Sequence, residues 1–186
     1  MAGSLPLKLK REAKRLARVL EATDSQLVLA ESCTGGLAAS SLTQIPGISR
    51  HFCGSQVVYQ SETKTQWLNL SKKRIRQHGA ESLETTEALA RQILNKTRQA
   101  TVSGAITGDL GPMPSNPKKV GVIFVACAIQ TQGATKIKFS TQMRLPKPRG
   151  VPATELRILL QQVASLTLLR MVRQMLSDTL RQHRGN

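Results

Sequence analysis

Four polar side chains interrupt an apolar stretch near the start of the chain, in the segment QLVLAESCTGGLAASSL (26–42). Glu31, Ser32, Cys33 and Thr34 follow apolar residues and precede two glycines. A strand that enters a helix through a glycine turn presents free backbone N–H groups, and the helix dipole favours an anion there. The segment therefore predicts an anion-binding turn, a turn that presents the Ser32 hydroxyl as a nucleophile, or both. In the structural alternative, Ser32 and Thr34 only cap the helix and the glycines relieve crowding.

A tyrosine and a lysine follow in the segment VYQSETK (58–64). A serine hydroxyl is a weak nucleophile, and a neutral lysine or a tyrosinate beside it can accept its proton. A lysine serves this purpose only where burial or another cation lowers its pKa. If Tyr59 ends a strand and Lys64 lies in the next helix, both can reach the strand end that carries Ser32. The alternatives are a tyrosine in the core and a lysine on the surface.

The spacing of apolar residues predicts the elements that must position these groups. We expect helices over residues 6–22, 35–43, 62–68, 72–77, 85–98 and 153–180, with Ser61 and Ser71 capping the third and fourth. We expect strands over residues 26–30, 56–59, 102–106, 120–129 and 135–143, the last two forming a hairpin. Segment 107–119, rich in glycine and proline, is expected to be a loop. This order predicts a single α/β domain over 1–186, with a core of about 8–178, in which helices flank a central mixed sheet.

Charge and cysteine content limit the class of protein. The 186 residues include 27 Lys and Arg against 11 Asp and Glu, a formal charge of +16. Because these basic residues are spread along the sequence and aromatic residues make up only 3%, a solvated basic surface is favoured over nucleic-acid binding. Three cysteines and three histidines at scattered positions favour neither a disulfide framework nor a zinc site.

The distribution of apolar residues also bears on location and assembly. The sequence has no apolar segment long enough to span a bilayer, and residues 1–25 do not resemble a signal peptide. We therefore expect a cytoplasmic protein that does not associate with membranes. The amphipathic helices expected over 6–22 and 153–180 indicate a homo-oligomer.

Four segments match a known family in their order as well as their composition. They are LAESCTGGL (29–37), YQSETK (59–64), QHGAES (77–82), and AITGDLGP (105–112) followed by KKVGVIFVA (118–126). Together they resemble the C-terminal domain of the competence/damage-inducible protein CinA, a family whose stand-alone members include nicotinamide mononucleotide deamidases. The first segment is the most specific, and the resemblance extends over about residues 8–178.

The resemblance implies an α/β fold, no metal or other cofactor, and a small-molecule pyridine nucleotide as the partner. The implied enzyme is an amidohydrolase that converts nicotinamide mononucleotide to nicotinate mononucleotide and ammonia. Carried over by position, Ser32, Tyr59 and Lys64 form the catalytic set. We expect Ser32 to attack the carboxamide, Lys64 to accept its proton, and Tyr59 to relay or stabilise that proton. Backbone N–H groups of 33–36 are expected to hold the oxyanion.

The substrate-binding residues expected around this set are Glu31, Cys33, Thr34, Gly35, Gly36, Thr107, Gly108, Gly111 and Arg157. Glu31 either orients Lys64 or a loop backbone, or is purely structural. Cys33 is expected to pack as a small apolar side chain. The glycines and the threonine of 107–111 are expected to line the same pocket from a neighbouring strand end, where ligands of open α/β sheets bind.

The sequence departs from the family pattern around the expected phosphate site and pocket mouth. Gly54 stands where the family has a basic residue, and Ser61 where it has asparagine. Ala153 replaces one of two paired arginines, for which Arg149 is a possible substitute, and the loop over 109–119 is shortened. The alternative function is therefore a nucleotide-binding or regulatory module of the same family that has lost catalysis.

Overall fold

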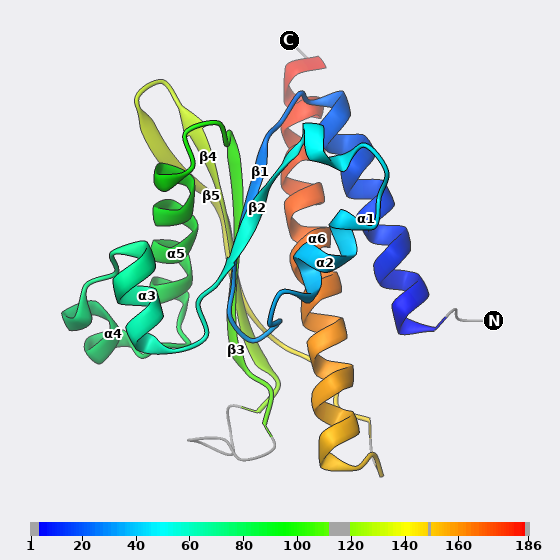
Figure 1. The fold of residues 1–186 in the computed structure, drawn as a ribbon, viewed down its shortest axis with the longest axis vertical. Coiled ribbons are helices and arrows are strands. Elements are labelled where there is room, and N and C mark those ends of the chain that lie inside the picture. The colour runs from blue at the N-terminus through cyan, green and yellow to red at the C-terminus, as the bar shows by residue number, and fades with distance from the viewer. Residues whose placement is uncertain (1–3, 112–119, 149, 185–186) are drawn as a thin grey trace.

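The computed structural model describes residues 4–111, 120–148 and 150–184, with side chains up to residue 181. In this part of the chain a five-stranded sheet with the order β2-β1-β3-β4-β5 separates two layers of helices (Figure 1). Strands β1, β2 and β3 are parallel to one another, whereas β4 pairs antiparallel with both β3 and β5. The strands are β1 (Leu27–Glu31), β2 (Phe52–Val57), β3 (Val102–Asp109), β4 (Val122–Thr131) and β5 (Ala134–Arg144). The predicted mixed α/β sheet is confirmed.

Helices cover both faces of this sheet. One face carries α1 (Leu5–Ala22), α2 (Leu37–Thr43) and α6 (Ala153–Arg184), and the other carries α3 (Ser61–Leu68), α4 (Lys72–His78) and α5 (Leu83–Lys96) (Figure 1). A short 3-10 helix, η1 (Ile48–Arg50), precedes β2. None of the helices that the structure describes is long and apolar enough to cross a membrane.

Two separate apolar cores result from the alternation of side chains along the strands. In β1, Leu27 and Leu29 pack into the core under α1 and α6, whereas Val28 and Ala30 pack into the core under α5. Successive strand residues point to opposite faces, so a strand covered on both faces is buried throughout and is apolar except where a polar side chain is hydrogen-bonded, as Glu31 is at the end of β1. This explains why all five residues of β1 are buried, and why the polar turn after it stands out in the sequence.

Several predicted boundaries were wrong at the strand ends that matter for the site. The helix predicted over 35–43 begins at Leu37, because Gly35 and Gly36 have φ angles of 61° and 92°. The strand predicted over 56–59 is β2, which ends at Val57, so Tyr59 lies beyond it. Strand β3 continues to Asp109 and takes up the start of the predicted loop. The rest of that loop, 112–119, and Arg149 lie outside the described residues.

Of the two predicted serine caps, one is confirmed. The Ser71 hydroxyl accepts a hydrogen bond from the Arg74 N–H at 3.4 Å and caps α4. Ser61 is instead the first residue of α3, and the N-cap position is taken by Gln60. Gly54 lies where the register of β1 with β2 shifts, with a φ of 138°, so glycine meets a backbone requirement of this bulge.

Candidate active site

A buried serine and a buried lysine meet at the carboxyl end of the central strand β1. Ser32 follows the last residue of β1 directly, and its N–H donates to the Ile106 carbonyl of β3 at 3.2 Å. Lys64 comes from α3, and its Nζ lies 3.2 Å from Ser32 Oγ. Ser32 is 4% exposed and Lys64 is fully buried. The structure thus joins the two residues that the sequence placed in different strand–helix units.

The surroundings of Lys64 lower its pKa, so its neutral form is more accessible than that of an exposed lysine. Burial lowers the pKa of the ammonium because it loses its hydration, and the Glu81 carboxylate opposes this effect as the smaller contribution. Lys64 Nζ also donates to the Tyr59 carbonyl at 3.1 Å, which fixes the amine beside the serine. A neutral amine at hydrogen-bond distance can accept the hydroxyl proton, so the pair has the geometry of a nucleophile with its base.

Glu31 holds the turn that carries Ser32. Its buried carboxylate accepts hydrogen bonds from the N–H groups of Gly36, Ala38 and Ala39 at 3.1, 3.2 and 3.0 Å. It also accepts one from the Ser55 hydroxyl of β2 at 3.1 Å. Of the alternatives considered for Glu31, the structure selects the orientation of a loop backbone. Its hydrogen bonds in the structure go to α2 and β2 and not to Lys64.

This arrangement corrects the prediction of an anion-binding turn for a ligand. The chain's own carboxylate takes the anion position at the start of α2, and the Gly35 N–H donates to the Ser32 carbonyl at 3.1 Å. These N–H groups are therefore not available to an oxyanion, contrary to expectation. Among the described residues, the Cys33 and Thr34 N–H groups have no backbone acceptor. The fully buried Thr34 hydroxyl also has no hydrogen-bond partner there.

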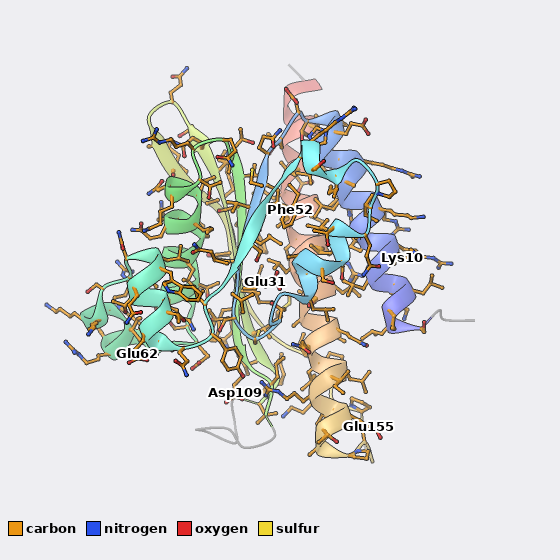
Figure 2. The ribbon with its side chains drawn as sticks, viewed as in Figure 1. Lys10, Glu31, Phe52, Glu62, Asp109 and Glu155 are labelled. Carbon is orange, nitrogen blue, oxygen red and sulfur yellow. The ribbon has the colours of Figure 1, made fainter. Side chains whose placement is uncertain are left out.

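Replacing Glu31 by glutamine is expected to lower the free energy of unfolding by about 3 kcal/mol. The amide would set its NH₂ group against N–H donors and would remove the charge that several of them share. Urea unfolding followed by circular dichroism measures the loss. Glu62→Gln is the matched control, because Glu62 is exposed in the first turn of α3 (Figure 2) and should change stability by less than about 1 kcal/mol. Equal effects of both substitutions would contradict the role given to Glu31.

Tyr59 and Arg157 meet at the surface near this pair. The Tyr59 side chain is 55% exposed, and its hydroxyl accepts a hydrogen bond from Arg157 Nη2 at 2.7 Å. Arg157 also donates to the Gly111 carbonyl, so it links α6 to the segment after β3. In the part of the chain described, the phenol has no hydrogen bond with Ser32 or Lys64. Tyr59 contacts the lysine through its backbone carbonyl, and Arg157 supplies a cation at the site.

The threonine and the glycine at the end of β3 have structural partners. Thr107 is fully buried, and its hydroxyl is hydrogen-bonded to that of Thr86 in α5 at 2.8 Å. A Cβ added at Gly108 would lie 2.7 Å from the Val122 carbonyl, so the close approach of β4 requires glycine there. Thr107 therefore ties β3 to α5, and Gly108 allows the close packing of β3 against β4.

Cys33 packs as expected from its position next to the serine. It is 4% exposed and belongs to the core under α1 and α6. Burial raises the pKa of its thiol to about 12, which leaves it protonated at neutral pH. Because only a thiolate is a strong nucleophile, Cys33 does not compete with Ser32.

Three neighbours of the site were not identified from the sequence. Ser55 supports Glu31, Glu81 acts on the charge of Lys64, and Gln161 Nε2 donates to the Thr34 carbonyl at 2.9 Å. Gln161 lies four residues after Arg157 on α6, and this spacing places both on one helix face. That spacing is the sequence signal from which Gln161 could have been identified as a neighbour of the site. Nothing in the local sequence distinguishes Ser55 from other serines.

The serine hydroxyl and the lysine amine of the site suit acid–base chemistry between side chains and substrate. Among the described residues there is no group of three or more His, Cys, Asp and Glu side chains that could hold a metal ion. The fold and the site define a class: α/β proteins with a buried serine–lysine pair at the carboxyl end of a central parallel strand. Residues 9–150 match the model of the CinA C-terminal domain, and the chain belongs to this family.

Similar proteins agree with this assignment. A CinA-like protein of Desulfotalea psychrophila is 43% identical over 103 residues, which are 55% of this chain and 25% of that protein. One from Prochlorococcus marinus is 39% identical over 124 residues, 66% of this chain and 29% of that protein. The chain thus spans between a quarter and a third of the length of these curated relatives.

Solved structures share the fold over most of the chain. A competence/damage inducible protein from Agrobacterium tumefaciens has a TM-score of 0.77 and 27% identity, and the match covers 90% of this chain and 95% of that one. A CinA superfamily protein from Klebsiella pneumoniae has a TM-score of 0.72 and 22% identity, with 88% and 97% coverage. The second likeness concerns the fold alone.

Proposed function

We propose that the protein is an amidohydrolase that hydrolyses the carboxamide of nicotinamide mononucleotide to nicotinate mononucleotide and ammonia. The observation that carries this proposal is the 3.2 Å contact between Lys64 Nζ and Ser32 Oγ, with both side chains buried. The contact pairs a weak nucleophile with a base whose pKa burial lowers. The resemblance of LAESCTGGL and YQSETK to the deamidases supports the nicotinamide carboxamide as the group attacked.

In the first half of the reaction, Ser32 Oγ bonds to the carboxamide carbon while its proton moves to the neutral amine of Lys64. The carbonyl oxygen becomes an oxyanion. Lys64 then returns the proton to the amide nitrogen, and the C–N bond breaks. Ammonia is released, and the acyl group remains on Ser32 as an ester. In the second half, water adds to the ester carbon and gives a proton to Lys64. Collapse releases nicotinate mononucleotide, and the proton returns to Ser32.

The oxyanion requires donors that the fold has not already engaged. The Thr34 N–H has no backbone acceptor among the described residues, and the Thr34 hydroxyl has no hydrogen-bond partner there, so both groups meet this condition close to Ser32 in the chain. We assign them to the oxyanion in place of the glycine N–H groups. One such donor lowers the activation free energy of acyl transfer by about 3 kcal/mol. Tyr59 takes two positioning roles, holding Lys64 through its carbonyl and Arg157 through its hydroxyl.

Arg157 is the cation that we assign to the substrate phosphate. We therefore expect kcat/KM for ammonia release to be at least about tenfold higher with nicotinamide mononucleotide than with nicotinamide riboside, because a charged hydrogen bond contributes about 1.5–3 kcal/mol. Arg157→Gln should bring the nucleotide down to the level of the riboside. Arg170→Gln, an exposed arginine of the same helix, is the control and should leave the ratio unchanged.

Two other outcomes decide between the candidate functions. If nicotinamide mononucleotide raises the melting temperature of the protein but no ammonia is released, the chain is a binding module without catalysis. If neither the nucleotide nor the riboside binds or reacts, the proposed substrate is wrong, and another amide is needed to account for the pair.

A further inference from the structure

A groove follows α1 on the side that faces α2 and η1. Two hollows of about 340 and 630 Å³ lie in succession along it. Residues of α1 line both, at the helical spacing 7, 10, 14, 17, 18 and 21 that marks one face of a helix. The opposite wall comes from α2 and from the segment around η1, which ends in Arg50.

This groove is separate from the serine–lysine pair. Helix η1, which ends at Arg50, lies two residues before the start of β2 and so at the amino end of the parallel strands, whereas Ser32 follows the carboxyl end of β1. The five residues of β1 span about 16 Å between these two ends. A ligand in the hollow beside η1 can therefore bind without touching the reacting amide.

Exposed cations occur at regular intervals in the groove. Lys10, Lys14 and Arg18 succeed one another every four residues, about 6 Å apart along the helix axis. Lys10 lines the smaller hollow, and Arg50 lines the larger one together with Lys14 and Arg18. Among the described residues none of these four side chains forms an ion pair. Glu21 is the one acidic residue that lines the two hollows, so the groove carries a clear excess of positive charge.

We propose that this groove binds the phosphodiester backbone of a nucleic acid without reading its sequence. A row of cations at even spacing matches an extended chain with one negative charge per nucleotide better than it matches a single phosphate. Among the described residues that line the groove there is no Phe, Tyr or Trp, and His51 is the one ring on which a base could stack, so the contacts are mainly to phosphates. The sequence disfavoured this partner because its basic residues are dispersed, but the fold brings 10–18 and 50 together.

The proposal predicts binding that weakens steeply with salt. Four phosphate contacts give a slope of about −3.6 for log K against log salt with a duplex, and about −2.8 with a single strand. We expect a Kd on the order of 10⁻⁵ M near physiological salt, independent of base sequence. Fluorescence anisotropy with a labelled duplex, its separate strands, and a scrambled duplex measures both quantities. The two slopes show which form of nucleic acid fits the groove.

Matched charge removals locate the contact. Lys14→Gln/Arg18→Gln should reduce the slope by about 1.8 and weaken binding on the order of tenfold. Lys72→Gln/Lys73→Gln removes the same charge from exposed positions of α4 and should leave binding nearly unchanged. Ammonia release should stay at the unsubstituted rate in both variants, so this test does not depend on the proposed catalysis.

Three results would overturn the proposal. The first is no binding of any nucleic acid near physiological salt. The second is an equal loss in both double variants, which would mean that the overall charge and not the groove attracts the ligand. The third is binding of free AMP as tight as that of the duplex, which would make the groove a site for a single phosphate. Arg50→Glu, on the opposite wall, is the second variant and should weaken binding at least as much as the α1 pair.

Discussion

Ser32→Ala is expected to lower the rate of ammonia release from nicotinamide mononucleotide by at least about 10³-fold, because it removes the proposed nucleophile that forms the ester. The substitution removes the hydroxyl that is hydrogen-bonded to Lys64 and keeps the Ser32 backbone, whose N–H donates to Ile106, so the fold should be unchanged. A coupled ammonia assay measures the rate, and mass spectrometry of the quenched enzyme detects the ester on the unsubstituted protein.

Ser40→Ala is the matched control for this experiment. Ser40 is an exposed serine of α2, and its loss should leave the rate unchanged. If Ser32→Ala releases ammonia at the unsubstituted rate, Ser32 is not the nucleophile, and hydrolysis through an acyl-enzyme is excluded. A variant that binds the nucleotide but releases no ammonia agrees with the mechanism.

Lys64→Met is expected to reduce kcat by about 10²- to 10⁴-fold while the nucleotide still binds. Methionine fills a space similar to that of the buried lysine stem, so the loss measures the amine and not the packing. Isothermal titration measures binding, and the ammonia assay measures kcat. Lys73→Met, on the exposed side of α4, is the control and should leave kcat unchanged. Equal rates for the Lys64 and Lys73 variants would remove Lys64 from the mechanism.

The pH dependence tests the same role without a substitution. Lys64 accepts a proton only as a neutral amine, so kcat should rise with pH and level off above the pKa of Lys64. Burial places this pKa below the ordinary lysine value of 10.5, so the rise should be complete at a lower pH than for an exposed lysine. A rate that falls as the pH rises through this range would mean that the charged ammonium is the active form.

The positions of the chemical groups along the fold could be predicted from the sequence. The apolar residues before Glu31 and the polar turn after them indicated a buried strand that ends at a reactive turn, and the structure has β1 and Ser32 there. The distance from Tyr59 to Lys64 indicated a helix that returns the lysine to the same edge, which is α3. These inferences succeeded because strand alternation and helix periodicity fix the direction in which each side chain leaves the backbone.

The sequence could not predict the hydrogen-bond partners of these side chains. Glu31 was equally compatible with a bond to Lys64 and with a bond to a backbone, and only the positive φ of Gly36 turns the N–H groups of α2 toward it. The Tyr59 hydroxyl lies on Arg157, 98 residues away, which no local pattern encodes. Long-range partners depend on how α6 crosses the sheet, and that packing is set by the whole core.

The carboxylate of Glu31 has a consequence for how the reactive turn behaves before a substrate arrives. Its hydrogen bonds to α2 are made within the chain, so the turn is preorganised and the entropy of ordering it is lost during folding and not in each catalytic cycle. These N–H groups already donate to Glu31, so they are not available to sulfate or inorganic phosphate from the medium. Such ions should therefore not bind at the start of α2, and we expect any inhibition by them to come from Arg157 or from the free donors of Thr34.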